Sequence, residues 1–364
     1  MKTVVLFDID SRIPNLALMK LSTYHKSQGM NVILSKTVSH IKADRHLGSA
    51  VFRARSTMEK IDRLRKIYGA DVEIGGSGVD LARRLTPEVE ACFPDYSLYG
   101  HANYALGFLT RGCPKKCAFC VVPAKEGRLK LQVASFSGFV PGGWKKVMLL
   151  DDNLLCYSDA LGLLEEMTAR DYKVNFSQTL DIAYLTEPLY QALLKVDSQN
   201  AKFTRRQFYF SLNFPGTIRQ FENRKSMLKG FGEDRVSVVS IYGFDTSLSE
   251  DYRRWMMLRR LRLVPFFQEY WPIEGVPAKI PEPFFDMDLD EVIRLTFRSN
   301  GQNWEKYLRW LNRRYFETFG RYYKPLLETI YRYNNKERIH KYLQQPEILT
   351  SELYCSYLTG GDSG

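Results

Sequence analysis

Short apolar runs alternate with amphipathic stretches along the first hundred residues. The runs have the length of buried strands, and they cover 2–10, 30–36, 70–76 and 94–100. The amphipathic stretches have helical spacing and end in glycine, and they cover 15–29 and 61–69. A strand, a helix and a second strand in this order form a unit with parallel strands. The pattern therefore predicts an open α/β domain over residues 1–100.

The same alternation resumes after residue 101, with longer helices, and continues to about residue 275. The predicted strands cover 104–111, 145–152, 173–181, 206–213, 235–244 and 263–272. The predicted helices cover 158–170, 186–196, 217–230 and 248–261. Six strands joined by crossover helices predict a partial parallel (β/α)6 barrel over residues 101–275. An active site in such a barrel lies at the carboxyl ends of its strands.

A proline-rich break near residue 276 opens a third region, 276–364, for which we expect a helical C-terminal extension. Residues 298–342 carry eleven Lys and Arg, four Asp and Glu, and eleven aromatic residues. Interleaved basic and aromatic side chains can neutralise and stack on a nucleic acid. The alternative, which the pattern favours, is a helical appendage with a buried aromatic stripe, because Trp304, Tyr307 and Trp310 are spaced three apart.

The composition is that of an ordinary globular protein, with 45% hydrophobic and 26% charged residues among 364. The apolar run after Lys2 is too short for a secretory signal, and no run approaches the roughly 18 residues of a membrane span. We therefore expect a cytoplasmic protein without a membrane span. The 52 basic and 41 acidic residues give a net charge of +11, which favours an anionic substrate or partner.

Half of the six cysteines lie in one stretch, FLTRGCPKKCAFCVVP, residues 108–123. Without an export signal, such clustering favours metal binding or catalysis over disulfides. One alternative is a zinc site that takes a fourth ligand from Cys92 or His101. The other is an iron–sulfur cluster held by three cysteines, which leaves one iron open to a ligand. The nearby cations Arg111, Lys115 and Lys116 are expected to offset the thiolate charge.

The string Cys113-Pro-Lys-Lys-Cys117-Ala-Phe-Cys120 resembles the signature of radical S-adenosylmethionine (SAM) enzymes. The resemblance implies that Cys113, Cys117 and Cys120 hold a [4Fe-4S] cluster whose open iron chelates the amino and carboxylate groups of SAM. It also implies an electron donor such as flavodoxin or ferredoxin. In that family, reductive cleavage of SAM usually yields a 5′-deoxyadenosyl radical that attacks the substrate.

Later strands are similar to the corresponding segments of these barrels and present polar residues at their carboxyl ends. The resemblance implies a SAM-binding set of Phe119, Asp152, Asn153, Gln178, Ser211, Asn213 and Tyr242. The strand-end residues Asp181 and Ser240 have an equally simple interpretation as loop hydrogen-bonding groups. The chain departs from the family because no Gly-Gly-Glu segment follows the second strand.

The order of a Rossmann-like domain and a radical SAM barrel resembles the cobalamin-binding subgroup over residues 1–275. Residues implied to face cobalamin are Asp10, Pro14, Asn15, Gly75 and Gly76. The subgroup motif Asp-x-His-x-x-Gly is not kept, because Arg12 stands at the place of the axial histidine. Bound cobalamin would imply methyl transfer. A domain that no longer binds cobalamin would imply a reaction by hydrogen abstraction only.

Two functions from different classes remain open at this point. The first is a radical SAM enzyme that modifies an unknown substrate, with cobalamin-dependent methylation as one outcome. The second is a non-catalytic nucleic-acid-binding protein with a zinc-stabilised cysteine loop and a basic C-terminal contact surface. The predicted barrel favours the enzyme, since a binding module needs no ring of inward-facing strand ends.

Overall fold

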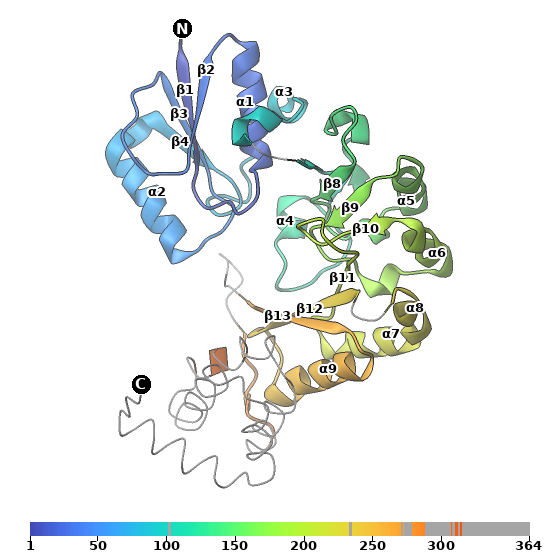
Figure 1. Ribbon diagram of the computed structural model, residues 1–364. Helices are drawn as coiled ribbons and strands as arrows, with labels where there is room; N and C mark the ends of the chain where they lie inside the picture. The colour runs from blue at the N-terminus through green and yellow to red at the C-terminus, as the bar shows by residue number, and fades with distance from the viewer. Residues whose placement is uncertain are drawn as a thin grey trace, which may run out of the picture. The chain divides into compact units, whose positions relative to one another are not determined.

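A computed structural model shows two compact units, Met1–Tyr209 and Phe210–Gly364, each described by itself (Figure 1). The structure describes residues 1–100, 103–232, 235–270, 272, 279–287, 307, 310, 311 and 314. Most of the region 276–364 thus lies outside the described residues. The division into domains 1–100, 101–275 and 276–364 stays a prediction.

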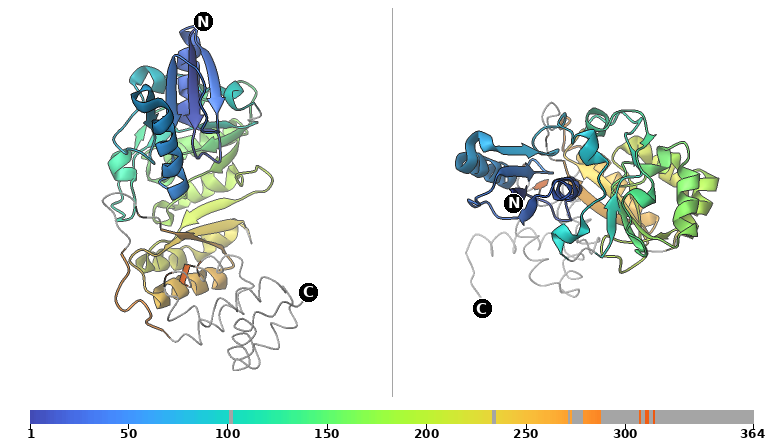
Figure 2. Two further views of the ribbon diagram at one scale, coloured as in Figure 1. Left: turned by 90° about the vertical axis from the view of Figure 1, so that its left-hand side faces the viewer. Right: turned by 90° about the horizontal axis from the view of Figure 1, so that it is seen from above.

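A four-stranded parallel sheet in the order β2-β1-β3-β4 forms the first part of the first unit. Its strands are β1 (Thr3–Asp8), β2 (Asn31–Ser35), β3 (Arg45–Ser49) and β4 (Val72–Gly75). The long helices beside it are α1 (Leu16–Ser27) and α2 (Arg55–Tyr68), drawn in Figures 1 and 2. The central strand β1 is buried on both faces, which explains its unbroken apolar run.

Alternate residues of β1 supply two separate cores. Val5 and Phe7 share a core with Ile61 and Leu64 of α2. Val4 and Leu6 share the other with Leu18 of α1. Because successive strand residues point to opposite faces, the two helices cover opposite sides of the sheet. The predicted parallel α/β arrangement of this part of the chain is confirmed.

Two predictions for this domain are wrong in detail. The segment 94–100, predicted as a strand, contains the 3-10 helix η2 (Tyr96–Tyr99). The side chain of Asp95 caps it by accepting a hydrogen bond from the N–H of Ser97 at 3.0 Å, which favours a turn over an extended chain. Strand β3 was not predicted from the sequence, because Arg45 and His46 interrupt its apolar pattern. The remaining short elements are η1 (Gly69–Asp71) and α3 (Pro87–Glu90).

A second parallel sheet of the first unit has the order β10-β9-β8-β5. Its strands are β5 (Ala105–Gly107), β8 (Lys146–Leu149), β9 (Lys173–Phe176) and β10 (Asp197–Ser198). Its helices are α5 (Ala160–Ala169) and α6 (Glu187–Lys195), and its 3-10 turns are η3 (Phe136–Gly138), η4 (Leu154–Cys156) and η5 (Ile182–Tyr184). The strand predicted over 104–111 is divided into β5 and β6 (Thr110–Arg111), and β6 pairs in antiparallel fashion with β7 (Leu131–Gln132).

A third sheet has the order β11-β12-β13, and its last two strands are parallel. Its strands are β11 (Phe208–Ser211), β12 (Val236–Tyr242) and β13 (Val264–Glu269). Its helical elements are η6 (Pro215–Thr217), α7 (Ile218–Asn223), α8 (Lys225–Gly230) and α9 (Leu248–Arg260). The helix predicted over 217–230 is therefore two helices that meet at Arg224.

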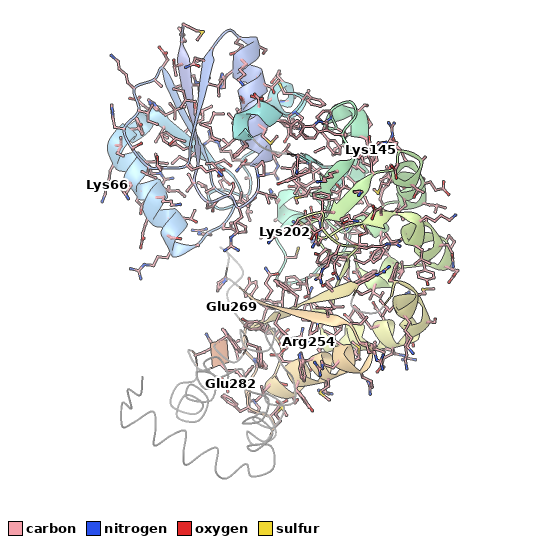
Figure 3. The ribbon with its side chains drawn as sticks, viewed as in Figure 1. Lys66, Lys145, Lys202, Arg254, Glu269 and Glu282 are labelled. Carbon is pink, nitrogen blue, oxygen red and sulfur yellow. The ribbon has the colours of Figure 1, made fainter. Side chains whose placement is uncertain are left out.

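A buried guanidinium organises the strand ends of the second unit. Arg254 of α9 is fully buried and forms an ion pair with the buried Asp251 (Figure 3). Its Nη1 donates to the main-chain oxygens of Leu212 and Asn213 at 3.0 and 2.9 Å. Its Nη2 donates to the oxygen of Ile241 at 3.0 Å. One side chain thereby fixes the carboxyl ends of β11 and β12.

The mixed α/β class with parallel sheets is confirmed, and all six strands predicted for the barrel are present. Among the described residues they fall in two sheets, so the single partial barrel stays a prediction. In the C-terminal region, Tyr307 and Trp310 are buried, as the stripe prediction requires, while Trp304 lies outside the described residues. Within the part of the chain that is described, none of the helices combines the length and apolar character of a membrane span.

Asp95 joins η2 to α1, and this contact predicts a pH-dependent contribution to stability. Ser22 and Lys26 donate to its Oδ2 at 2.6 and 2.7 Å. Burial alone would raise the pKa of this carboxyl, but hydrogen bonds from Lys26, Ser22 and Ser97 lower it overall. A lowered pKa means that the stabilisation is complete above the ordinary pKa of about 4 and is lost as the pH falls further.

We expect Asp95→Asn to lower the free energy of unfolding at pH 7 by about 1–3 kcal/mol, because the charged hydrogen bonds are lost. The difference from the wild type should shrink as the pH falls below about 4 towards the lowered pKa of Asp95. Urea unfolding followed by circular dichroism measures the free energy of unfolding of both proteins at each pH. Asp62→Asn, on the exposed face of α2, serves as the control. Equal stability of Asp95→Asn and the wild type at pH 7 would contradict this assignment.

Candidate functional site

The three clustered cysteines lie in one loop, residues 112–129, which we call the cysteine loop. It connects β6 to β7, whose pairing sets Thr110 opposite Gln132 and Arg111 opposite Leu131. Inside the loop, the N–H of Cys113 donates to the oxygen of Gly127 at 3.1 Å. The loop begins shortly after β5, so it starts from the carboxyl end of a strand in a parallel sheet, as predicted.

Asp151, at the end of β8, fixes the start of the loop. Its carboxyl group accepts the N–H of Leu109 at 3.0 Å, the N–H of Thr110 at 2.5 Å and the Thr110 hydroxyl at 2.6 Å. The side chain is buried, and burial raises the pKa of Asp151 although the hydrogen bonds from Thr110 and Leu109 oppose the rise. This contact also explains why the strand predicted over 104–111 is interrupted.

Gly112 is required by the backbone at the first turn of the loop. Its φ is +87°, in the region that favours glycine. A Cβ atom at this position would lie 2.1 Å from the main-chain oxygen of Leu129. Gly127 has the same φ of +87°, but a Cβ atom there would have no neighbour within 4 Å. Both glycines allow the turn, and Gly112 also allows the close approach of the two loop ends.

Arg111 binds carboxylates at the base of the loop. Its guanidinium lies 3.2 Å from Glu126 and 3.4 Å from Glu90, and it covers the ring of Phe108 at 4.2 Å. Burial alone would raise the pKa of Glu126, but the charges of Arg111 and Lys125 lower it. The expectation that Arg111 offsets thiolate charge is not supported by these contacts, since its charge is matched by carboxylates.

Lys115 has a double role among the expected cations. It forms an ion pair with Asp181, and although burial opposes the change, this hydrogen bond raises the pKa of Lys115. Its charge also favours the thiolate of Cys117, whose pKa is nevertheless raised because burial dominates. Lys116 is exposed. This contact agrees with the interpretation of Asp181 as a loop hydrogen-bonding group rather than a SAM ligand.

The three thiols are half-buried and differ in acidity. Burial raises the pKa of Cys120 to about 11. Cys113 has the opposite shift, because the neighbouring thiol of Cys156 and the nearby amide of Asn153 lower its pKa. The neighbouring Cys113 and burial raise the pKa of Cys156. Cys113 is therefore the most readily ionised thiol of the loop.

Cys156 is the residue that sequence reasoning missed. The 3-10 turn η4 after β8 brings it near Cys113, and its Sγ donates to the oxygen of Asn153 at 3.1 Å. The available signal was its position a few residues after strand β8, which pairs directly with β5. Residues that follow neighbouring parallel strands meet at one edge of the sheet.

The side chains available as ligands bear on the choice between a zinc site and an iron–sulfur cluster. Within the described residues, no three His, Cys, Asp or Glu side chains lie close enough together to hold a metal ion. Of the fourth zinc ligands considered, Cys92 donates its Sγ hydrogen to the oxygen of Glu88 at 3.3 Å, and His101 lies outside the described residues. The donor chemistry fits an iron–sulfur cluster, which takes Cys thiolates as its usual ligands.

Two of the residues predicted to bind SAM border the thiols. Asp152 is half-buried, and its pKa is raised to about 6 by burial. Asn153 adopts a left-handed conformation with φ of 47°, and its Oδ1 accepts the N–H of Asp181 at 3.1 Å. Its Nδ2 is buried without a hydrogen-bond partner in the structure, near enough to Cys113 to lower the pKa of that thiol. An orphaned buried donor marks a place for an acceptor.

The other predicted SAM residues have different surroundings. Phe119 is half-buried in the cysteine loop, and Gln178, after β9, is exposed. In the second unit, Ser211 is half-buried, and Asn213 accepts the N–H of Ile241 at 3.1 Å. The ring of Tyr242 is buried in an aromatic cluster.

The aromatic cluster of the second unit accounts for the burial of Tyr242. The centroid of its ring lies 5.1 Å from that of Tyr307 and 5.3 Å from that of Trp310. Ser240, on the same strand, is buried, and its Oγ has no hydrogen-bond partner in the structure. The roles of Tyr242 and Ser240 stay predictions.

The residues predicted to face cobalamin take part in protein contacts. Asp10 accepts the N–H groups of Val51 and Phe52, both at 2.8 Å. Asn15 caps α1 and donates to Ser11 and Ser49, both at 3.0 Å.

The three remaining candidates add no ligand-facing polar side chain. Pro14 is half-buried, and the oxygen of Gly75 accepts the N–H of Ala50 at 3.0 Å. A Cβ atom on Gly76 would lie 2.2 Å from the oxygen of Ala50, so this glycine allows approach of the protein's own backbone. With these contacts, the five residues do not make up a preformed cobalamin site.

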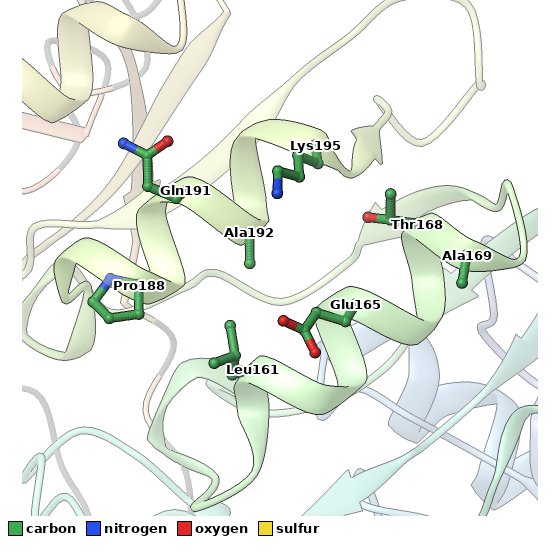
Figure 4. A pocket seen from close by; sticks show the side chains of 8 residues that line it. All are labelled: Leu161, Glu165, Thr168, Ala169, Pro188, Gln191, Ala192 and Lys195. Carbon is green, nitrogen blue, oxygen red and sulfur yellow. The ribbon is translucent and has the colours of Figure 1, made fainter.

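A groove of about 430 Å³ lies between α5 and α6 (Figure 4). Its lining residues are Leu161, Glu165, Thr168, Ala169, Pro188, Gln191, Ala192 and Lys195. None of the predicted site residues belongs to it, and it is separate from the chemistry of the cysteine loop.

No protein-family model and no curated protein matches the chain. The chain is similar over 58% of its length to solved structures of SuiB from Streptococcus suis. The structure bound to S-adenosylmethionine has 15% identity and a TM-score of 0.36 over 48% of the SuiB chain. The structure bound to the precursor peptide SuiA has 14% identity and a TM-score of 0.36 over 46%. The matched part thus spans less than half of SuiB.

The two loop glycines predict a matched pair of variants. Gly127→Ala should cost about 1 kcal/mol of stability, because only its positive φ is unfavourable. Gly112→Ala should cost roughly 1–3 kcal/mol more, because the added Cβ also collides with Leu129. Urea unfolding measures the difference, and the rate of thiol modification by a maleimide reports whether the loop has opened. Equal costs for the two variants would contradict the close contact at Gly112.

Proposed function

We propose that the protein is a radical SAM enzyme in which Cys113, Cys117 and Cys120 hold a [4Fe-4S] cluster. The observation that carries this proposal is the cysteine loop itself. Three half-buried thiols stand in one loop that starts at the carboxyl end of the parallel strand β5. Asp151 and Gly112 hold the loop in a fixed conformation. When bound, such a cluster supplies the electron that cleaves SAM reductively.

The chain's own residues then have the task of holding the loop and binding SAM. Asn153 has a buried, unpartnered Nδ2, which suits a carboxylate acceptor. Asp152 offers a half-buried carboxyl group, which suits a cationic group when it is ionised. SAM carries both kinds of group at its amino acid end. Gln178, Phe119, Ser211, Asn213 and Tyr242 complete the proposed set.

The finer features of the proposal concern partners and outcome. The net charge of +11 supports an anionic substrate, and the cluster requires an electron donor of the flavodoxin or ferredoxin kind. We also propose a cytoplasmic location, because the described cysteines are free thiols. Cobalamin-dependent methylation is left out of the proposal, because Asp10 and Asn15 are engaged in protein contacts.

The cysteine series tests the proposed function. Each of Cys113→Ala, Cys117→Ala and Cys120→Ala, purified and reconstituted without oxygen, should lose the iron–sulfur absorption and the formation of deoxyadenosine from SAM. Cys92→Ala is the matched control and should keep both, since Cys92 lies outside the loop. Cys156→Ala should keep its iron, because Cys156 contacts a ligand without being one.

Two results would overturn the proposal. One is a loop variant that forms deoxyadenosine at the wild-type rate. The other is a colourless wild-type protein that contains zinc and binds single-stranded nucleic acid with a strong salt dependence, which would favour the binding-module hypothesis.

A further inference from the structure

Strand β7 and its flanks present their apolar side chains to solvent. Two residues between them hold this segment to the protein, because Lys130 donates to the oxygen of Asp152 and Gln132 accepts from the Tyr157 hydroxyl at 3.1 Å. The odd-numbered residues Leu129, Leu131 and Val133 are 73%, 58% and 51% exposed. We call these three side chains the outer stripe. Leu131 and Val133 stand at alternate positions and share one face, and Leu129 lies in the bend just before β7.

The same strand has an open edge. Among the described residues, β7 pairs with β6 alone. The N–H of Val133 points towards β6, where it donates to the oxygen of Leu109 at 2.8 Å. In an extended strand the neighbouring N–H, that of Gln132, therefore points to the open edge. An unpaired edge next to an exposed apolar face is a template for a further strand.

The flank of the outer stripe is basic. Arg128 is exposed, and within the described part of the chain no hydrogen bond or ion pair involves its side chain. The whole protein has a net charge of +11. An acidic residue at one end of the added strand would complement Arg128. Three side chains make too small an area for a stable dimer, which buries about 1,200–2,000 Å², whereas a short linear peptide matches their extent.

We propose that the β7 edge binds an extended peptide with apolar residues at alternate positions and an acidic residue near Arg128. Main-chain hydrogen bonds to the edge give affinity, and the outer stripe selects the alternating side chains. Because β7 ends the cysteine loop, the peptide would be a segment of a polypeptide substrate. This last assignment rests on the proposed function, whereas the docking site does not.

The test uses a fluorescein-labelled peptide of alternating valine and threonine, with two aspartates at each end, and fluorescence anisotropy with the full chain. The control peptide has proline in place of each threonine. We expect Leu131→Glu and Gln132→Pro each to weaken binding at least tenfold. Gln132→Ala, which keeps the N–H, should bind like the wild type. Proline is tolerated on a strand where its nitrogen faces solvent, so Gln132→Pro should fold.

Several results would overturn the docking site. One is equal affinity of the wild type for the two peptides. Another is equal affinity of Gln132→Pro and Gln132→Ala for the valine–threonine peptide. A third is no binding of that peptide by the wild type. A dimer in sedimentation that Leu131→Glu dissociates would assign the outer stripe to a second copy instead. Iron content and deoxyadenosine formation, measured on the same samples, separate the two proposals. Wild-type protein that binds the peptide but holds no cluster would refute the enzyme and leave the docking site standing.

Discussion

The candidate site depends on one buried carboxyl group. Asp151 ends β8 and accepts three hydrogen bonds from Leu109 and Thr110, the residues that lead from β5 to the cysteine loop. Through it, the carboxyl ends of two neighbouring parallel strands are joined. The residues that follow Asp151 then lie beside the thiols, where Cys156 and Asn153 lower the pKa of Cys113. A buried polar group that is fully satisfied in this way fixes a single local structure.

The second unit uses the opposite charge for the same purpose. The buried guanidinium of Arg254 donates to three main-chain oxygens at the ends of β11 and β12, with Asp251 as its counter-ion. Removing one partner of such a buried pair leaves an uncompensated charge and is strongly destabilising. In both units, buried charged side chains determine where the strands end. Several residues predicted to bind SAM, among them Asn153 and Asn213, lie just after these strand ends.

Much of the fold could be predicted from the sequence because it depends on local periodicity. The alternation of Val4, Val5, Leu6 and Phe7 between two cores is visible as an unbroken apolar run. The pattern could not predict β3, whose Arg45 and His46 are polar, or the 3-10 helix that Asp95 caps. Both depend on contacts with residues distant in the sequence. For example, His46 stacks on Tyr68, and Asp95 accepts hydrogen bonds from Ser22 and Lys26 of α1.

Cys113, Cys117 and Cys120 could be predicted as candidate site residues, because their spacing in the sequence is itself the signal. The pairing of Arg111 with Glu126 and Glu90 depends on tertiary structure and carries no local signal, whereas the position of Cys156 after β8 was a weak one. The most direct test of the central claim is the iron and acid-labile sulfide content of wild-type protein purified without oxygen. We predict about four of each per chain, as in a [4Fe-4S] cluster. Stoichiometric zinc without acid-labile sulfide would contradict the claim.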